Sequence, residues 1–350
     1  MSYQTFVVRR SEAGRTVAEF LRSRLRLSGF DARRLIREHW VRVGGVPCLD
    51  QTLRLHSGQR VTVRLPQIHK GKATQRRPKG RPRPATQAGR PKPQVPGLVI
   101  RFADAHVVVV EKPAGLTTMR HTYEAAEFGP RGRRFLPPTL ADLLPDLLNA
   151  NRPGRRVQVR AVHRLDRDTS GLVVFARTAQ AAKHLGEQFR RHSVERRYLA
   201  IVRGRAANAR IETFLVRDRG DGRRGSSRQP GRGERAVTHV QVVEDLGDFT
   251  LVECRLETGR THQVRIHLGE SGTPLCGERV YDRLLHGKPM NPEATPFARP
   301  ALHAAALGFN HPATGKRMHW NSPLPPDMAN LLEQLRARKK HRRPGNANGS

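Results

Sequence analysis

The stretch HRLDRDTSGLVVFA, residues 163–176, joins a loop dense in charge to an apolar segment. Asp166 lies between Arg164 and Arg167, a few residues before the apolar run begins. That run, residues 171–176, is short and rich in β-branched side chains, which predicts a buried strand. Mixed charge on a loop usually indicates only a solvated ion cluster. The significance of Asp166 therefore depends on the rest of the chain.

Strands predominate on both sides of this stretch. Apolar, β-branched runs predict strands at 107–110, 196–204 and 249–258. A helix is expected at residues 179–192, because Thr178 is a suitable N-cap. A few helices among many strands indicate an α+β fold with a mixed sheet.

Residues 262–268 can be interpreted in two ways. The Val and Ile of this segment favour a strand, whereas Thr261 as a cap and Gly269 as a terminator favour a short helix. We expect the helix.

The chain has a large excess of positive charge. Its 350 residues carry a formal net charge of +35, which indicates a polyanionic partner and makes nucleic acid the first candidate. A membrane partner is not expected, because no apolar run approaches the ~18 residues needed to span a bilayer. The N-terminus lacks the pattern of a signal or transit peptide. The cysteines Cys48, Cys254 and Cys276 form no short pair, so we expect reduced core cysteines and a cytoplasmic protein.

A basic segment divides the chain into two parts. Residues 66–97 contain nine Lys or Arg residues, no acidic residue and no aromatic residue. Proline, glycine and like charges prevent a core, so we predict a basic, disordered linker. The basic tail, residues 336–350, is predicted to be disordered for the same reason. The chain is thus expected to comprise an N-terminal domain at 1–65 and a C-terminal domain at 98–335.

The N-terminal domain has the pattern of a small α/β module. Val17, Phe20, Leu21 and Leu25 recur at helical spacing, and a second short helix and a few strands follow. Arginines occupy the polar positions of the helices, which favours a phosphate-contacting surface over a merely solvated face. The candidate RNA-binding residues are Arg22, Arg33, Arg34 and Arg37. The segments TVAEFLRSRL (16–25), ARRLIREHWVRVGG (32–45) and SGQRVTV (57–63) resemble the S-four type RNA-binding domain.

Several chemistries find no support in the C-terminal domain. His262 and His267 are five residues apart, so they would not face one metal ion on either a strand or a helix. No acidic cluster supplies oxygen ligands, and we expect no metal. The glycine-rich segments lack the ending of a nucleotide-binding loop, and no nucleophile elbow accompanies Ser170. A lone carboxylate with cationic partners remains.

Five segments carry a family resemblance. EKPAGL (111–116), HRLDRDTSGL (163–172), RRYLAIVRG (196–204), TGRTHQVRIH (258–267) and RPALHAAALGFNHPATGKRM (299–318) resemble, in this order, the motifs of the RluA-type RNA pseudouridine synthases. The resemblance spans about residues 98–330. It implies a mixed-sheet catalytic domain that isomerises uridine to pseudouridine in RNA without a cofactor.

The resemblance also implies roles for individual residues. Asp166 would be the nucleophile, Arg265 its cationic partner, and Tyr198 the aromatic residue that stacks on the target base and takes the carbon proton. Arg164 would support the displaced nucleotide, because a uridine must leave its helix to react. The matching motifs add His163, Thr169, Arg260, His262 and Gln263 as substrate-binding candidates.

Three functional hypotheses compete. The first is a pseudouridine synthase, expected to act as a monomer, with large-subunit ribosomal RNA as substrate and transfer RNA as the alternative. The second is a catalytically silent RNA- or ribosome-binding factor. The third is a nuclease, which would require an acidic metal cluster or paired histidines that the sequence lacks. The presence of Asp166, Tyr198 and Arg265 together favours the enzyme.

Overall fold

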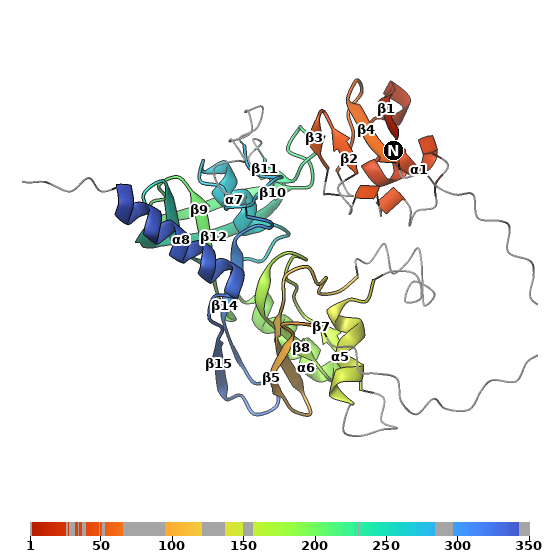
Figure 1. The fold of residues 1–350 in the computed structure, drawn as a ribbon. Helices are drawn as coiled ribbons and strands as arrows, with labels where there is room; N and C mark the ends of the chain where they lie inside the picture. The colour runs from red at the N-terminus through yellow and green to blue at the C-terminus, as the bar shows by residue number, and fades with distance from the viewer. Residues whose placement is uncertain are drawn as a thin grey trace, which may run out of the picture. The chain divides into compact units, whose positions relative to one another are not determined.

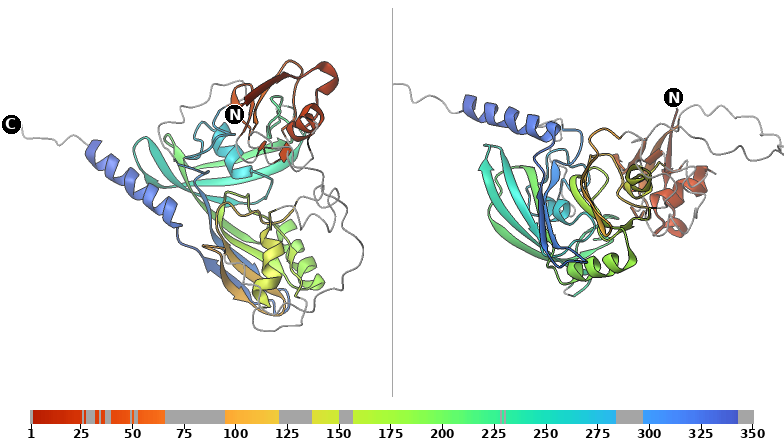
Figure 2. Two further views of the ribbon diagram at one scale, coloured as in Figure 1. Left: turned by 45° about the vertical axis from the view of Figure 1, so that its right-hand side comes forward. Right: turned by 90° about the horizontal axis from the view of Figure 1, so that it is seen from below.

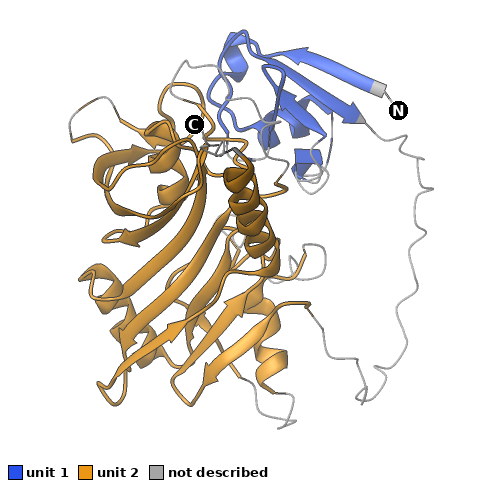
Figure 3. Cartoon of the chain, turned by 60° about the vertical axis from the view of Figure 1, so that its left-hand side comes forward, with its two compact units in different colours: residues 1–94 blue, residues 95–350 orange. Residues whose placement is uncertain are grey.

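The computed structural model describes residues 2–25, 27, 32, 33, 35, 36, 40–48, 50, 53–65, 95–120, 137–149, 157–227, 229, 231–283 and 297–342. The chain forms two compact units, residues 1–94 and 95–350 (Figure 3). Of the predicted linker, residues 66–94 lie outside the described residues. The second unit begins within a few residues of the predicted domain start.

The first unit is a small sheet covered by helices. Its elements are β1 (Ser2–Val7), the 3-10 helix η1 (Arg10–Glu12), α1 (Val17–Leu25), β2 (Val41–Val43), β3 (Val46–Pro47) and β4 (Arg60–Leu65). The strands pair antiparallel in the order β1-β4-β2-β3. Val17, Phe20 and Leu21 of α1 share one core with the valines of β2 and β4, and the predicted second helix adds Leu35 and Ile36 to it. The predicted small α/β module is confirmed.

The second unit is built on one large mixed sheet (Figure 1). Its strands are β5 (Val99–Ala103), β6 (Val107–Lys112), β7 (Arg160–Ala161), β8 (Ser170–Ala176), β9 (Glu195–Arg203), β10 (Ala209–Val216), β11 (Gly225–Ser226), β12 (Glu234–Asp245), β13 (Phe249–Leu256), β14 (Leu302–Asn310) and β15 (Arg317–Asn321). The order is β11-β10-β12-β13-β9-β14-β8-β6-β5, with β15 on β14 and β7 on β8. Strands β14 and β8 pair in parallel, whereas β14 and β9 pair antiparallel. The predicted mixed sheet is confirmed.

Within the described residues, four helices pack against this sheet: α5 (Leu140–Leu148), α6 (Ala179–Arg190), α7 (Gln263–Glu270) and α8 (Pro326–Arg342). Side chains of α5 and α7 join one core with Val173 and Tyr198. Leu185 of α6 joins a second core with Leu172 and Val174, which alternate with Val173 along β8 and therefore point to the other face. This double coverage explains why every residue of β8 is buried.

The local predictions are confirmed for most of the second unit. The runs at 107–110, 171–176, 196–204 and 249–258 lie in β6, β8, β9 and β13. Thr178 caps α6 by accepting a hydrogen bond of 3.0 Å from the backbone N–H of Ala181.

The helical interpretation of residues 262–268 is right, but both predicted end signals are wrong. The N-cap is His262, in the left-handed region at φ 59°, and not Thr261. Gly269 lies inside α7 and does not terminate it. A Cβ at this position would collide with the carbonyl oxygen of Tyr281. Tertiary packing therefore requires this glycine.

The prediction of disorder from residue 336 onward is also wrong in part. Helix α8 continues to Arg342, and residues 343–350 lie outside the described residues. Met328, Leu331, Leu332 and Leu335 anchor the first half of α8 on the sheet, and its second half extends outward (Figure 2). Ion pairs of Arg336 with Glu244 and of Lys339 with Asp245 stabilise this continuation.

Candidate active site

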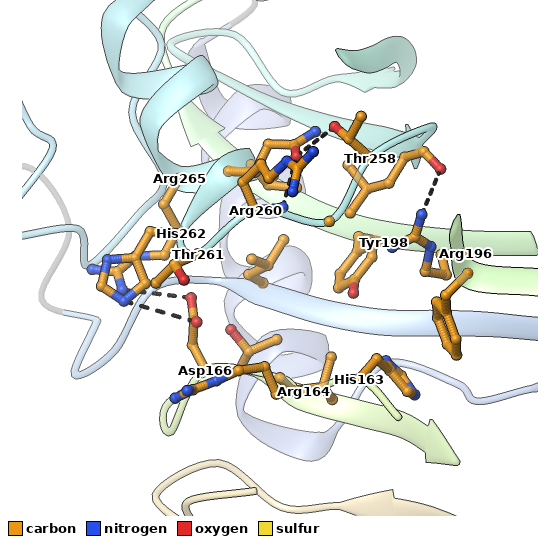
Figure 4. A pocket seen from close by; sticks show the side chains of 18 of the residues that line it. His163, Arg164, Asp166, Arg196, Tyr198, Thr258, Arg260, Thr261, His262 and Arg265 are labelled. Atoms are coloured by element: carbon orange, nitrogen blue, oxygen red, sulfur yellow. Dashed lines mark hydrogen bonds and ion pairs between the residues drawn. The ribbon is translucent and has the colours of Figure 1, made fainter. Parts of the chain in front are cut away.

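A pocket of about 520 Å³ opens on the face of the large sheet where α7 lies (Figure 4). It is lined by the loop before β8, the end of α6, β9, the loop after β13 with the first turn of α7, and Leu302 of β14. These segments carry Asp166, Tyr198 and Arg265, which are distant in sequence. The fold thus gathers the three residues that the sequence singles out as catalytic.

Asp166 lies in a tight turn at the entrance to β8. The backbone N–H of Thr169 donates to the carbonyl of Asp166 at 3.2 Å, and Thr169 itself is buried at the pocket wall. The hydroxyl of Thr118 donates to the carbonyl of Leu165 and accepts from its N–H, at 2.7 and 3.1 Å. Buried Lys112 donates to the carbonyl of Arg167 at 3.0 Å. The turn is therefore held from both sides of Asp166.

Two basic side chains approach the Asp166 carboxylate from the loop and first turn of α7. His262 Nε2 lies 3.8 Å from Oδ1, and Arg265 Nη1 lies 3.7 Å from Oδ2 (Figure 4). The carboxylate side chain is only 19% exposed. Burial acts to raise the pKa of Asp166, but the charges of His262, Arg265, Arg164 and Lys112 outweigh it and hold the pKa below its usual value. Asp166 is therefore ionised at neutral pH despite its burial.

Arg265 is oriented by a second, deeper carboxylate. Its Nε and Nη2 donate to the two oxygens of Glu278 at 2.8 and 2.9 Å. The Glu278 side chain is fully buried and also accepts backbone hydrogen bonds, the shortest from Val280 at 2.9 Å. Burial would lower the pKa of Arg265, but Glu278 and Asp166 together raise it. The guanidinium is thus fixed in orientation and permanently charged.

His262 is placed by its backbone and by Tyr281. Its ring Nδ1 lies 2.7 Å from the Tyr281 hydroxyl, and its φ of 59° turns the ring toward Asp166. The Tyr281 ring is buried, and the Arg265 guanidinium lies 5.2 Å over its centroid. One aromatic side chain therefore contacts both basic side chains that face Asp166.

Tyr198 lies on β9 at the middle of the pocket (Figure 4). Burial raises the pKa of its phenol to about 12, an effect that Arg196 opposes and Asp166 reinforces. At neutral pH the phenol is protonated. Its ring therefore offers an apolar face, and its hydroxyl can move a proton only if another group accepts the phenol proton.

Arg196 lies two residues before Tyr198 on the same face of β9 and lines the pocket. Its Nη2 donates to the carbonyls of Leu256 and Glu257 at 3.3 and 2.9 Å, and its guanidinium covers the Phe189 ring at 5.5 Å. The residue is only 8% exposed, and its buried Nε has no hydrogen-bond partner within the described part of the chain. This charge lies close enough to Tyr198 to lower the phenol pKa.

The other predicted substrate-binding residues also line the pocket, but several of them make hydrogen bonds or ring contacts within the protein. His163 stacks on Phe189 at 4.6 Å, and its Nε2 accepts a 3.0 Å hydrogen bond from the Val174 N–H. Burial lowers the pKa of His163 to about 3, so the ring is neutral. Arg164 is half-buried at the pocket wall.

Gln263 and Arg260 organise the loop that leads into α7. The Gln263 carbonyl accepts from the Thr258 hydroxyl and the Arg260 N–H, at 2.7 and 3.0 Å. Its amide donates to Val237 and Thr238 at 2.9 and 3.0 Å, so its hydrogen-bonding capacity is used within the protein. The Arg260 guanidinium pairs with Glu234 at 2.7 Å. Both residues position the loop.

Of the predicted RNA-binding arginines, Arg22 is exposed on α1 and Arg33 is half-buried. Arg34 and Arg37 lie outside the described residues.

Sequence reasoning missed Lys112, Arg196 and Glu278. Lys112 and Arg196 fall within the segments EKPAGL and RRYLAIVRG that carry the family resemblance, and this is the signal that could have identified them. Glu278, between Gly277 and Arg279, has no such local signal. All three are buried in the structure.

Three further properties concern the described part of the chain. No group of three His, Cys, Asp or Glu side chains in these ranges could hold a metal ion. None of the helices seen there is long and apolar enough to cross a membrane. As predicted, Cys48, Cys254 and Cys276 are buried, and none of the three forms a disulfide.

Comparisons with known proteins identify the class that this fold and pocket define. Residues 106–270 match the RNA pseudouridylate synthase family. The ribosomal large subunit pseudouridine synthase D of Zymomonas mobilis is 40% identical over 255 residues, which cover 73% of this chain and 76% of that protein. The protein of the same name from Pseudomonas aeruginosa is 39% identical over 248 residues, covering 68% and 72%.

A solved structure agrees. Human RNA pseudouridylate synthase domain containing 4 superposes with a TM-score of 0.53 at 25% identity, covering 68% of this chain and 92% of that one. The chain belongs to the RNA pseudouridine synthase family. It is an isomerase that forms pseudouridine in RNA, as the sequence motifs predict. The S-four resemblance of the first unit stays a prediction.

Proposed function

We propose that this enzyme converts specific uridines of large-subunit ribosomal RNA to pseudouridine, with Asp166 as nucleophile and the target nucleotide flipped into the pocket. The single observation that carries the mechanism is the Asp166 carboxylate, buried and ionised, 3.7 Å from a guanidinium that Glu278 holds in place. The names of the relatives from Zymomonas mobilis and Pseudomonas aeruginosa support the choice of RNA.

The reaction rearranges atoms without adding any. The bond between uracil N1 and ribose C1′ breaks, the ring turns, and a bond forms between C5 and C1′. The C5 hydrogen then leaves as a proton, and N1 gains one. Asp166 supplies an electron pair to ribose C1′ as uracil leaves with the electrons of the N1–C1′ bond, and the carboxylate is displaced again when C5 bonds to C1′. A carboxylate can act in this way only while ionised. His262 and Arg265 maintain that ionisation.

Tyr198 acts on the base in two ways. Its ring stacks on uracil and retains the ring after the N1–C1′ bond breaks. Its hydroxyl accepts the C5 proton while passing its own proton to water or to Asp166, because a phenol with a pKa of about 12 has no free base form at neutral pH. Arg196 stabilises the negative charge that develops on the phenol oxygen in this step.

Base flipping is required because the enzyme must reach the reacting atoms of the uridine. The reacting atoms of a paired uridine are enclosed in the helix stack, so the nucleotide must leave it. Arg164, on the turn that carries Asp166, is assigned to the displaced nucleotide or to the gap it leaves.

Transfer RNA is the alternative substrate, and a direct comparison separates the two. Pseudouridine is mapped in ribosomal and transfer RNA from cells with and without the gene, and purified protein is incubated with each unmodified RNA. We expect sites in large-subunit ribosomal RNA that disappear with the gene and are restored by the purified protein. Sites that disappear from transfer RNA alone would reassign the substrate.

A further inference from the structure

The sheet of the first unit has two faces with opposite character. Val61 and Val63 of β4 point toward α1 and belong to the core of the unit. The alternate residues of β4 point to the other face. Among the described residues, none of these alternate side chains belongs to the core that α1 covers.

The register of the strands identifies the outer face. Tyr3, Thr5 and Val7 of β1 lie opposite Arg64, Thr62 and Arg60 of β4, and Arg42 of β2 lies opposite Thr62. A hydrogen bond of 3.1 Å between the hydroxyls of Thr5 and Thr62 confirms that these rows share one face. We call these seven residues the outer sheet face.

The outer sheet face exposes an aromatic ring beside positive charge. Tyr3 is 68% exposed and Val7 is 55% exposed, although large apolar side chains in this protein are generally covered. Arg60 and Arg42 are exposed on the neighbouring strands. The nearby acids point elsewhere: Glu12 pairs with Arg24 at 2.7 Å, and Glu19 accepts from the Thr16 N–H at 2.9 Å.

We propose that the outer sheet face binds an unpaired segment of the substrate RNA, with a base stacked on Tyr3 and phosphates on Arg42, Arg60 and Arg64. A flat aromatic surface flanked by arginines is what single-stranded nucleic acid requires, since stacking tolerates any base and arginines neutralise the backbone. The Thr5 and Thr62 hydroxyls suit phosphate or ribose oxygens. A protein partner would require a broader apolar patch than Tyr3 and Val7 supply.

This surface is distinct from that of Arg22 and Arg33, because α1 and the helical residues Ala32 and Ile36 pack on the opposite face of the sheet. The inference depends on the proposed RNA substrate but on no residue of the catalytic pocket. It therefore predicts defects in RNA binding that leave the chemistry intact.

The test uses the full-length protein and its RNA substrate. Tyr3→Ala should weaken RNA affinity by roughly 5- to 150-fold, whereas Tyr3→Phe, which keeps the ring, should bind like the wild type. The triple variant Arg42→Gln, Arg60→Gln, Arg64→Gln should flatten the slope of log affinity against log salt by about 2, at ~0.7 per phosphate contact. The control variant Arg9→Gln, Arg10→Gln, Arg15→Gln loses the same charge from exposed positions off this face and should change the slope much less.

Two further measurements make the outcome decisive. RNA containing 4-thiouridine should crosslink to the peptide that holds Tyr3, and the single-turnover rate at saturating RNA should stay at the wild-type value in Tyr3→Ala. Equal slopes for the two triple variants, or wild-type affinity in Tyr3→Ala, would overturn the proposal. Dimerisation in RNA-free sedimentation that Tyr3→Ala abolishes would assign the face to a second copy instead. A wild-type protein that binds RNA through this face but forms no pseudouridine would refute the proposed function alone.

Discussion

Glu278 grips the guanidinium of Arg265 through two hydrogen bonds of 2.8 and 2.9 Å, and leaves Nη1 facing Asp166. Arg265 is therefore hydrogen-bonded to Glu278 and forms only a longer ion pair with Asp166. Glu278, fully buried, fixes the orientation of Arg265, and Asp166, at 3.7 Å, is close enough to be kept ionised but stays available to substrate. Because 3.7 Å exceeds hydrogen-bond distance, no hydrogen bond between Arg265 and Asp166 has to break when a ribose approaches.

Glu278→Gln should slow the reaction without weakening RNA binding. The amide keeps one acceptor for Arg265 but loses the charge and one charge-assisted hydrogen bond, worth about 1.5–3 kcal/mol. We expect the single-turnover rate at saturating RNA to fall by about 10- to 100-fold. The control is Glu253→Gln, a half-buried carboxylate that pairs with Arg197 outside the pocket and should leave the rate unchanged. A wild-type rate in Glu278→Gln would show that Arg265 needs no such support.

Asp166→Asn should abolish pseudouridine formation and retain RNA binding. The amide has nearly the same shape but is a poor nucleophile, and the basic surfaces are untouched. The matched control is Asp168→Asn, on the same turn, whose carboxylate pairs with Arg167 at 3.1 Å and is more exposed. Product is measured in a cell-free assay, and affinity by gel shift. If Asp166→Asn turned over at a rate close to that of Asp168→Asn, the nucleophile assignment would be wrong.

The pH dependence should reflect the lowered pKa of Asp166. Only the ionised carboxylate is active, so the wild-type rate should remain level as the pH falls to about 4, the usual pKa of an aspartate, and decline below it. The double variant Arg265→Met, Glu278→Gln removes the cation without leaving a buried charge unpaired. Without the positive charge of Arg265, burial raises the pKa of Asp166. The acid limb of the pH–rate profile, where the rate falls as Asp166 is protonated, then moves toward neutral pH.

The residual rate of this double variant can be followed by release of tritium from C5-labelled uridine in RNA. Arg167→Met serves as the control, since Arg167 pairs with Asp168 and does not line the pocket. An acid limb at the same pH in all three proteins would contradict the electrostatic role of Arg265.

Gly171→Ala should destabilise the second unit far more than Gly315→Ala. Gly171 has φ 114°, and an added Cβ would meet the backbone of Ala304 on β14, 2.6 Å from its nitrogen. Strain and overpacking together should cost about 2–5 kcal/mol. Gly315 also has positive φ, at 70°, but has open space around it, so only the strain of about 1–2 kcal/mol applies.

The measurement for this pair is urea unfolding followed by the fluorescence of Trp320, which packs on Phe309 of the second unit. The Trp40→Phe background removes the signal of the first unit. Equal free energies of unfolding for the two variants would show that β8 and β14 can separate without loss.

The sequence by itself determined the elements and the identity of the central residue. β-branched runs predict β6 and β8, Thr178 predicts the start of α6, and the charged loop before residue 171 makes Asp166 a candidate whose role the motif resemblance implies. These features are local: strand propensity, capping and the boundary between polar and apolar sequence depend on neighbours in the chain. The motif resemblance then supplied Tyr198 and Arg265.

Only the tertiary structure decided how those residues are held. Lys112 reaches the turn of Asp166 from β6, Arg196 pins the loop after β13 beside Tyr198, and Glu278 orients Arg265 from a segment beyond α7. The left-handed backbone of His262 and the glycine inside α7 likewise depend on Tyr281. Burying an ion without a partner is strongly unfavourable, so each of these charged groups needs a partner of opposite charge or a hydrogen-bonding group. Those partners come from distant segments of the chain, and local sequence patterns do not encode such contacts.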